Sequence, residues 1–281
     1  MLKVLHSGFY STIQDSGRFG YRSFGVPVSG VMDAHSSRYA NTLLRNHEND
    51  AVLEMTMQGG KFQFLEPTQI VISGSDMQPR LNSIPINNNA IISITKNDIL
   101  EFGKLKSGIR AYLAIKGGFK TEIVLGSRSQ YKCITKGFRL HKNDVIAYDS
   151  NNSITKVSYS SVKYDDSILT SEKLEVFEGP EFKFLSEKQK KELMEIKFTI
   201  TNKNNRMAYQ LEPLFSNEMP SILTSPILPG TVQLTPSGQL IVLMRDCQTT
   251  GGYPRIFQLT EQSINILCQK TIKHNISFRL L

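Results

Sequence analysis

Two polar, glycine-rich segments, one near each end of the 281-residue chain, carry the residues best suited to chemistry. The first runs from Thr12 to Asp33 and the second from Met244 to Pro254. Each places aspartate and arginine beside glycines, which let a backbone turn sharply and approach a ligand closely. Neither segment has the period of a strand or a helix, so we expect both to form loops, where binding and catalytic residues concentrate.

The residue types in these segments suit a small polar ligand. Arginine offers a planar set of donors for carboxylate-like anions, and aspartate accepts an amide N–H or acts as a base. Consecutive glycines expose backbone N–H groups that stabilise a developing oxyanion. Together they fit a molecule with an amide, ureido or carboxylate group. The structural alternative is that Asp15 to Gly17 only form a turn and that Asp33 only caps a helix.

The signatures of several cofactors are missing from the sequence. There is no Gly-x-x-x-x-Gly-Lys-Ser/Thr loop for ATP phosphates and no Gly-x-Gly-x-x-Gly before a helix. The five histidines lie far apart and no Cys-x-x-Cys occurs, which argues against a zinc site. We therefore expect no metal, and any ATP site is not visible in this chain.

Composition narrows the class of protein. The net charge is +8, but the lysines are scattered and often lie beside acidic residues, so we expect no nucleic-acid partner. Three cysteines cannot all pair with one another, which favours a reducing cytoplasm. The N-terminus lacks the apolar region of a signal peptide. No apolar run approaches the roughly 20 residues of a membrane span, so we expect no membrane association.

The elements that must position the two segments are mainly β-strands. Short apolar stretches are separated by turn residues about every ten positions, which favours sandwiches or barrels. Three short helices are predicted, with N-terminal caps at Asp33, at Ser186 with Gln189, and at Thr260. The segment Asn151 to Ser171 is the best candidate linker. We therefore predict two domains, residues 1–165 and 166–281.

Three turns are predicted to join pairs of strands. One is Pro236-Ser237-Gly238, between Thr231–Leu234 and Gln239–Met244. The other two resemble each other, since Lys96-Asn97-Asp98-Ile99-Leu100 is echoed by Lys142-Asn143-Asp144-Val145-Ile146. The echo is compatible with two similar hairpins that arose by duplication, or with coincidence.

The chain resembles a known family over nearly its whole length, and the polar segments carry much of the resemblance. This is allophanate hydrolase subunit 2, also described as the C subunit of the prokaryotic 5-oxoprolinase, which is related to the carboxyltransferase domain of urea amidolyase. The matching motifs are Gln14-Asp15, Gly17-Arg18, Gly25-Val26-Pro27, Ser29-Gly30, Met32-Asp33, Leu125 to Ser129, Gly179 to Phe182, Asn205 to Met207, Pro229 to Gln233, Asp246 and Gln248 to Pro254.

The resemblance implies two cyclophilin-like β-barrel domains with a cleft between them. It also implies partners, the B and A subunits of 5-oxoprolinase, with which the family opens the lactam of 5-oxoproline to glutamate using ATP. Two alternatives stay open. One is a biotin-dependent carboxyltransferase component of the urea amidolyase type. The other is a non-enzymatic regulator of a histidine kinase.

Residue roles follow from the same resemblance. The expected catalytic residues of the cleft, anion clamps and bases, are Asp15, Arg18, Arg128, Arg206 and Asp246. The expected substrate-binding residues are Ser29, Asp33, Gln248, Thr249, Gly251, Gly252 and Tyr253. The chain departs from the family after Ser129, where a glycine-rich loop is reduced to a trace, and it has Ala208 and Arg45 where the family has glycine. These departures bear on substrate choice or activity.

Overall fold

The computed structural model describes residues 1–150 and 163–281 and contains two compact units. The first unit comprises Met1–Arg18 and Ser29–Leu169, and the second comprises Phe19–Val28 and Thr170–Leu281. The sequence predicts a boundary at residue 165. It does not predict that the short segment Phe19–Val28 belongs to the second unit. Most of the predicted linker lies outside the described residues.

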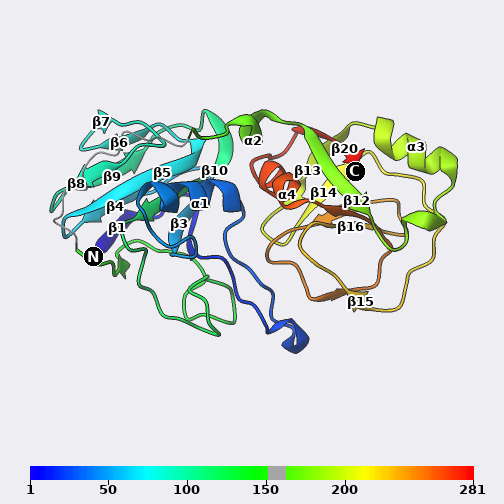
Figure 1. Cartoon of the computed structure of the whole chain (residues 1–281), viewed down its shortest axis with the longest axis horizontal. Coiled ribbons are helices and arrows are strands. Elements are labelled where there is room, and N and C mark those ends of the chain that lie inside the picture. The colour runs from blue at the N-terminus through cyan, green and yellow to red at the C-terminus, as the bar shows by residue number, and fades with distance from the viewer. Residues whose placement is uncertain (151–162) are drawn as a thin grey trace. The chain divides into compact units, whose positions relative to one another are not determined.

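The first unit is built from two antiparallel sheets, which are coloured blue to green in Figure 1. The six-stranded sheet has the order β11-β1-β4-β9-β6-β7, and the five-stranded sheet has the order β2-β3-β10-β5-β8. The strands are β1 (Leu2–His6), β2 (Tyr10–Gln14), β3 (Val52–Thr56), β4 (Lys61–Phe64), β5 (Thr68–Asp76), β6 (Pro79–Leu81), β7 (Ile84–Pro85), β8 (Ile92–Ile94), β9 (Ile99–Phe102), β10 (Ser107–Ile115) and β11 (Val145–Ile146).

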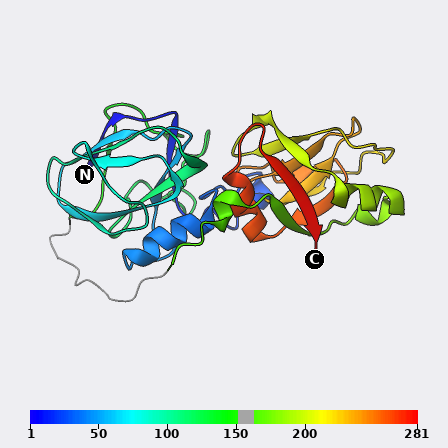
Figure 2. The same ribbon diagram turned by 90° about the horizontal axis from the view of Figure 1, so that it is seen from above.

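Alternation along the strands separates two cores in this unit. Leu113 and its neighbours two residues away on β10 face the main apolar core, together with Leu53 and Ile13. Tyr112 and Ala114 point to the opposite face, as the two-residue period requires. That face is covered by helix α1 (Ala34–Leu43), which contacts β5 and β10 (Figure 2). The five-stranded sheet is therefore buried on both sides.

The echoed Lys-Asn-Asp turns have the same backbone geometry. Asn97 and Asn143 both have positive φ angles, 72° and 74°. The carboxylates of Asp98 and Asp144 each accept a hydrogen bond from the N–H three residues earlier, at 2.7 and 2.8 Å. Neither turn closes a hairpin, which corrects the prediction. β8 and β9 lie in different sheets, and β11 pairs with β1, because distant strands supply the partners.

The second unit contains a closed barrel with the strand order β12-β19-β16-β17-β14-β13-β20. The predicted mainly β fold is thus confirmed, and so is the hairpin around residues 236–238, because β16 pairs with β17. The strands are β12 (Lys173–Glu178), β13 (Phe198–Asn204), β14 (Ala208–Glu212), β16 (Thr231–Leu234), β17 (Leu240–Leu243), β19 (Arg255–Leu259) and β20 (Asn275–Leu280), with a separate ribbon of β15 (Ser225–Pro226) and β18 (Thr250–Gly251).

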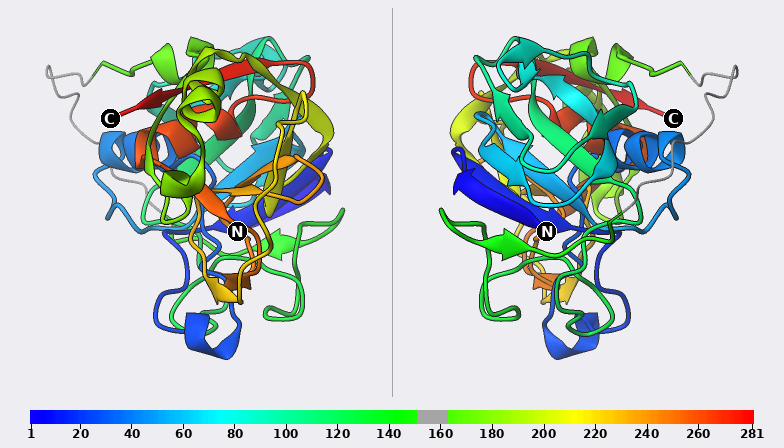
Figure 3. Two further views of the ribbon diagram at one scale, coloured as in Figure 1. Left: turned by 90° about the vertical axis from the view of Figure 1, so that its right-hand side faces the viewer. Right: turned by 90° about the vertical axis from the view of Figure 1, so that its left-hand side faces the viewer.

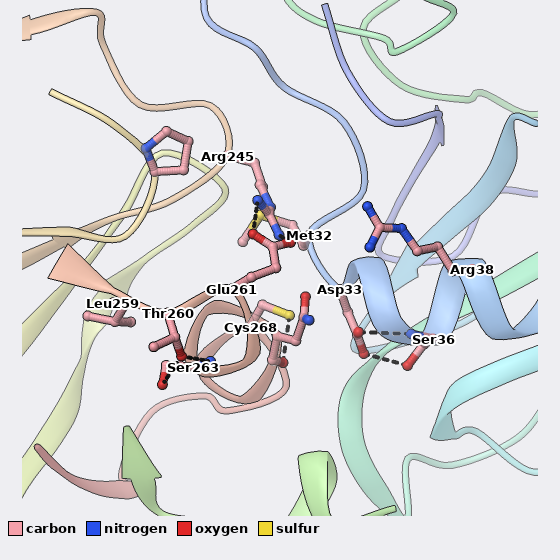
Figure 4. Close-up of polar contacts among 12 residues, drawn as sticks. Met32, Asp33, Ser36, Arg38, Arg245, Leu259, Thr260, Glu261, Ser263 and Cys268 are labelled. Atoms are coloured by element: carbon pink, nitrogen blue, oxygen red, sulfur yellow. Dashed lines mark hydrogen bonds and ion pairs between the residues drawn. The ribbon is translucent and has the colours of Figure 1, made fainter. Parts of the chain in front are cut away.

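The three predicted helices begin at the predicted caps. Asp33 accepts a hydrogen bond from the N–H of Ser36 at the start of α1, and Thr260 caps α4 (Glu261–Cys268) in the same way (Figure 4). Ser186 and Gln189 form a reciprocal capping box at α3 (Glu187–Glu195). Local hydrogen bonding explains this success, since a cap satisfies amides that have no partner within the helix. The remaining helical elements are η1 (Arg22–Phe24), α2 (Ser167–Thr170) and η2 (Phe182–Phe184).

Candidate functional site

A small cavity lies on the outer surface of the second barrel. Its volume is about 270 Å³. Three kinds of element line it: barrel strands β14, β16 and β17, the end of β13 with the turn that follows, and the second glycine-rich segment. The lining residues are Lys203, Asn205, Met207, Ala208, Gln210, Gln233, Ile241, Leu243, Gln248 and Tyr253.

Gln233 reaches this cavity because of the alternation along β16. Val232 and Leu234 point into the barrel core, so Gln233 points outward beside Ile241 of β17. A glutamine that points outward from a barrel is normally exposed to solvent, but Gln233 is only 1% exposed. A Cβ on Gly251 would lie 2.5 Å from its Nε2. The absence of that Cβ lets the backbone of the glycine-rich segment close directly over the glutamine amide.

Two amide atoms of the lining residues have no hydrogen-bond partner among the described residues. They are Nε2 of Gln233 and Oε1 of Gln248, one a donor and the other an acceptor, and both are buried. A buried polar atom without a partner costs about 1–3 kcal/mol. Most buried side-chain polar atoms in proteins are paired. Because both atoms are buried, a ligand in the cavity would contact them only after these side chains move.

The remaining lining supplies apolar walls and one positive charge. Met207, Ile241 and Leu243 are apolar, and Tyr253 is partly exposed at the margin. Lys203 is the charged residue among those that line the cavity, and no acidic side chain of the described residues accompanies it there. The cavity therefore combines a hydrophobic pocket with a few polar groups, which is the usual composition of a small-molecule site.

An ion pair holds the base of the second glycine-rich segment. Arg206 Nε and Nη2 donate to the two carboxylate oxygens of Asp246 at 2.8 and 3.0 Å. The two side chains are only 8% and 12% exposed. The backbone N–H of Asp246 also donates to the carbonyl of Arg206 at 2.9 Å. The two residues predicted as clamp and base are thus brought together and bind each other, immediately before Gln248.

The short segment Phe19–Val28 reaches the same region of the second unit. Figure 3 shows its η1 turn (blue) beside the β15–β18 ribbon. Arg22 Nη2 donates to the carbonyl oxygens of Ile227 and Thr249, the latter at 3.3 Å. Burial raises the pKa of the nearby Cys247 thiol to about 11, and the positive charge of Arg22 opposes that rise. Arg22 therefore anchors the backbone next to Gln248.

The first glycine-rich segment is organised around the carboxylate of Asp15. It accepts from the N–H groups of Gly17 and Arg128 at 2.9 and 2.6 Å, and from the hydroxyls of Ser127 and Ser129, both at 2.6 Å. Four donors surround one carboxylate, so it has little remaining capacity to accept a hydrogen bond from a ligand. Asp15 joins two loops that are more than a hundred residues apart in sequence.

Arg18 and Ser29 flank the segment Phe19–Val28, which belongs to the second unit. Arg18 is fully buried, and its guanidinium donates to the carbonyls of Val124 and Ser129 at 3.1 and 2.6 Å. Ser29 is buried, has a φ angle of 58°, and leaves its hydroxyl without a partner in the described part of the chain. The predicted anion-clamp role of Arg18 stays a prediction, since the structure directs its guanidinium to backbone carbonyls.

The remaining predicted site residues divide between the two regions. Arg128 directs its guanidinium to the carbonyl of Thr121, and Asp33 caps α1. In the second unit the carbonyl of Thr249 accepts from Arg22, and the carbonyl of Gly252 accepts from the N–H of Ile222. None of these contacts tests the predicted roles in substrate binding.

Sequence reasoning did not single out Gln233 and Lys203, which line the cavity. In the sequence Gln233 stands out only as the last residue of a family motif, and Lys203 only as one of many scattered lysines. The available signal is a glutamine flanked by inward-facing Val232 and Leu234, opposite a glycine pair. That signal becomes readable only when Gly251 is known to cover the strand.

The described residues contain no group of three or more histidine, cysteine or acidic side chains that could hold a metal ion. Over the same ranges, 1–150 and 163–281, no helix has the length and hydrophobicity needed to cross a membrane.

Relatives of this chain fall into two groups. It is 29% identical over 283 residues to the C subunit of 5-oxoprolinase from Escherichia coli (strain K12), an alignment that covers 99% of this chain and 90% of that protein. It is also 45% identical over 130 residues to urea amidolyase of Lachancea kluyveri, which covers 46% of this chain and 7% of that protein. The full-length similarity is therefore to the 5-oxoprolinase component.

A solved structure of a urea amidolyase and a family model also match this chain over nearly its whole length. The crystal structure of the K. lactis urea amidolyase superimposes with a TM-score of 0.89 at 26% identity, covering 100% of this chain and 18% of that one. The chain thus spans less than a fifth of that protein. The family model described as carboxyltransferase domain, subdomain A and B, matches residues 24–280. Because this match includes nearly the whole chain, the chain belongs to the carboxyltransferase domain, subdomain A and B, family.

Proposed function

We propose that this chain is the C subunit of an ATP-dependent 5-oxoprolinase, which hydrolyses the lactam of 5-oxoproline to glutamate. The observation that supports the proposal is the full-length similarity to the corresponding 5-oxoprolinase component of Escherichia coli, which extends through both glycine-rich segments. A cavity of the second unit, with apolar walls and a lysine among its lining residues, is a candidate site for a small acidic amide.

In this reaction the C–N bond of the lactam ring breaks. Water supplies the hydroxyl of the new carboxyl group, and the ring nitrogen leaves as the amine of glutamate. A lactam is a stable amide, and coupling to ATP hydrolysis drives its opening. A donor that polarises the lactam carbonyl lowers the barrier, because negative charge develops on that oxygen.

The activity requires the A and B subunits as partners, and the nucleotide would be bound outside this chain. Two features support this division of labour. The sequence has no phosphate-binding loop. The Escherichia coli relative, matched over nearly its full length, is itself named as one component of a multi-subunit enzyme.

Reconstitution tests the proposal. Glutamate release from 5-oxoproline and ATP would be measured with the A and B subunits, with and without this chain. We expect release only when all three are present. If A and B alone match the rate of the full set, or if the assembled complex releases nothing, the proposal is wrong.

Biotin-dependent carboxyl transfer is the second candidate. It is supported by the structural match to the K. lactis urea amidolyase and by the 45% identity to the Lachancea kluyveri enzyme. The same cavity would then accept the ureido ring of carboxybiotin. Transfer of labelled bicarbonate to urea, in the presence of a biotin carboxylase and its carrier, would distinguish it from lactam hydrolysis.

A further inference from the structure

We infer that the loop of residues 130–142 in the first unit binds an acidic segment of a protein partner, which is the A or the B subunit if the proposed function holds. The loop follows Ser129, where the chain departs from the glycine-rich pattern of its family. The inference goes beyond the proposed function, because it concerns a surface that contains none of the residues lining the cavity of the second unit.

The loop concentrates the positive charge of the chain. It includes four lysine or arginine residues but no aspartate or glutamate, so its formal charge is +4, half of the +8 of the whole chain. The acidic residues nearest to it in the sequence are Glu122 and Asp144. The loop is therefore the exception to the scattered distribution of lysines. Its cations are Lys132, Lys136, Arg139 and Lys142.

These four cations are not neutralised within the described part of the chain. All four residues are exposed, and among residues 1–150 and 163–281 no ion pair joins any of them to an acid. The neighbouring Asp144 directs its carboxylate to the backbone N–H of His141 at 2.8 Å. Exposed charges of one sign attract a surface of the opposite sign over about a Debye length, roughly 8 Å at physiological salt.

Hydrogen bonds fix both ends of the loop to strand β2. The N–H of Gln130 donates to the carbonyl of Ile13 at 2.9 Å, and its side-chain Oε1 accepts from the N–H of Ile13 at 3.0 Å. At the other end, the N–H of Leu140 donates to the carbonyl of Ser11 at 2.8 Å. In Figure 1 the loop belongs to the green segment that runs below the labelled strands of the first unit. A loop anchored at both ends loses less entropy when a partner binds.

The other residues of the loop favour a protein partner over a nucleic acid. Proteins that bind single strands present exposed aromatic rings on which bases stack. Tyr131 and Phe138 are only partly exposed, and the guanidinium of Arg139 lies 5.6 Å from the centre of the Phe138 ring. The loop also contains no helix or strand that could enter a groove of a duplex. Carboxylates pair with arginine and lysine without either feature.

Zero-length cross-linking of the complex reconstituted with the A and B subunits tests the inference. A water-soluble carbodiimide joins a lysine amine to a carboxylate where the two are in contact. We expect mass spectrometry to find Lys132, Lys136 or Lys142 joined to an aspartate or glutamate of one partner. If none of these lysines forms such a link in a complex that releases glutamate, the inference is overturned.

The affinity of the chain for the A and B subunits gives a second readout. A loop variant carries glutamine in place of its four cations, as Lys132→Gln, Lys136→Gln, Arg139→Gln and Lys142→Gln. A matched control carries glutamine at four exposed lysines outside the loop, as Lys96→Gln, Lys104→Gln, Lys188→Gln and Lys197→Gln. Each variant has a net charge of +4 instead of +8, so the two differ only in where the charge is lost.

Calorimetry at low salt should separate the two variants. We expect the Kd of the loop variant to be at least about tenfold higher than that of the wild type, and the Kd of the control to stay within about twofold. The difference should shrink at high salt, because salt screens exposed charges. Equal losses of affinity in the two variants would show that only the net charge matters and would overturn the inference.

The outcomes separate this inference from the proposed function. If the wild-type complex releases glutamate and the loop variant binds the A and B subunits as the wild type does, the loop assignment is wrong while the function stands. If the A and B subunits do not bind the chain, the proposed function fails, and fluorescent poly-L-glutamate and single-stranded DNA then serve as probes. Polyglutamate binding that is weaker in the loop variant than in the control would support the inference. Tighter binding of the DNA, or equal binding by the two variants, would overturn it.

Discussion

The two glycine-rich segments use their charged side chains in different ways. Around Asp15 in the first segment, four donors meet one carboxylate, and Arg18 is directed to backbone carbonyls. In the second segment, the carboxylate of Asp246 binds the guanidinium of Arg206. Neutral polar atoms in both segments have no partner among the described residues, namely Oε1 of Gln14, the hydroxyl of Ser29 and Oε1 of Gln248. Charged residues thus organise the loops, while several neutral polar groups remain unpaired.

This difference reverses the usual ranking of candidate residues. Aspartate and arginine attract attention in a sequence because they carry charge. A buried charge must be paired, so such residues are often consumed by structure. A buried amide without a partner costs less, and a protein can hold it open for a ligand. Loss of a charge should therefore cost stability, whereas loss of an amide should cost binding.

The largest effect is expected from Asp246→Ala. It removes the carboxylate that binds the mostly buried guanidinium of Arg206, which costs about 3–5 kcal/mol of unfolding free energy. The melting temperature of the second unit, measured by calorimetry, should fall. The double variant Asp246→Ala with Arg206→Met should recover part of the loss, because it also removes the charge that Asp246 neutralised. If Asp246→Ala melts like the wild type and only activity falls, Asp246 belongs with the binding residues.

Asp15→Ala should cause the second-largest loss of unfolding free energy. It leaves four donors without their carboxylate, and we expect a loss of about 3 kcal/mol, measured as a lower midpoint in urea. The matched control is Asp149→Ala, whose carboxylate is 73% exposed and pairs with Lys120 at 3.4 Å. That control should change stability by less than about 0.5 kcal/mol. An equal effect in both variants would contradict the structural role of Asp15.

Gly251→Ala tests whether the close approach of the glycine-rich segment to Gln233 matters for binding. The added Cβ would lie 2.5 Å from Gln233 Nε2, so the amide must shift away. We expect a KM for 5-oxoproline roughly fivefold higher, with a stability loss of about 1–3 kcal/mol. Gly137→Ala is the control, since its new Cβ would meet nothing closer than 3.7 Å. A loss of stability without a change in KM would argue that Gly251 serves only the fold.

The smallest effect is expected from Arg22→Met. It removes two hydrogen bonds to the carbonyls of Ile227 and Thr249 and should cost about 1 kcal/mol. Faster chymotrypsin cleavage after Phe24, which is 78% exposed, would report the loosened segment. Lys104→Met, at an exposed position in the first unit, should leave the cleavage rate unchanged. Cleavage at the wild-type rate in Arg22→Met would show that Arg22 does not anchor the segment.

Cysteine labelling adds a check on the same region. Cys133 is exposed, whereas Cys247 and Cys268 are buried. Since burial raises the pKa of Cys247 to about 11, its thiol stays protonated at a pH of about 8.5, well below that value, and reacts slowly with iodoacetamide. We expect mass spectrometry to find only Cys133 modified in the folded chain. Rapid labelling of Cys247 would mean that the backbone beside Gln248 is open.

Local signals in the sequence predicted most of the local structure. The caps at Asp33, Ser186 and Thr260 were readable because a cap and the amides it satisfies lie within one turn. The geometry shared by the two Lys-Asn-Asp turns was readable for the same reason. The partners of β9 and β11 were not readable from the sequence, because these strands pair with strands far away in the chain.

The site was less predictable than the fold. Gln248 and Tyr253 were predicted as substrate-binding residues from the family resemblance and their glycine-rich setting. Both line the cavity, and their roles stay predictions. Gln233 was not predicted, because a glutamine on a strand reads as a solvent-facing residue until the covering backbone is known. The segment Phe19–Val28 was missed because its membership of the second unit depends on contacts such as that of Arg22 with Ile227.

The most direct test of the account is the side-chain amide resonance of Gln233. In a ¹⁵N–¹H spectrum of the full chain, it would be assigned by its absence in Gln233→Met. Titration with 5-oxoproline should shift this resonance, because Gln233 lines the candidate cavity. If 5-oxoproline binds the chain and the Gln233 resonance stays in place, the assignment of 5-oxoproline to the cavity of the second unit is contradicted.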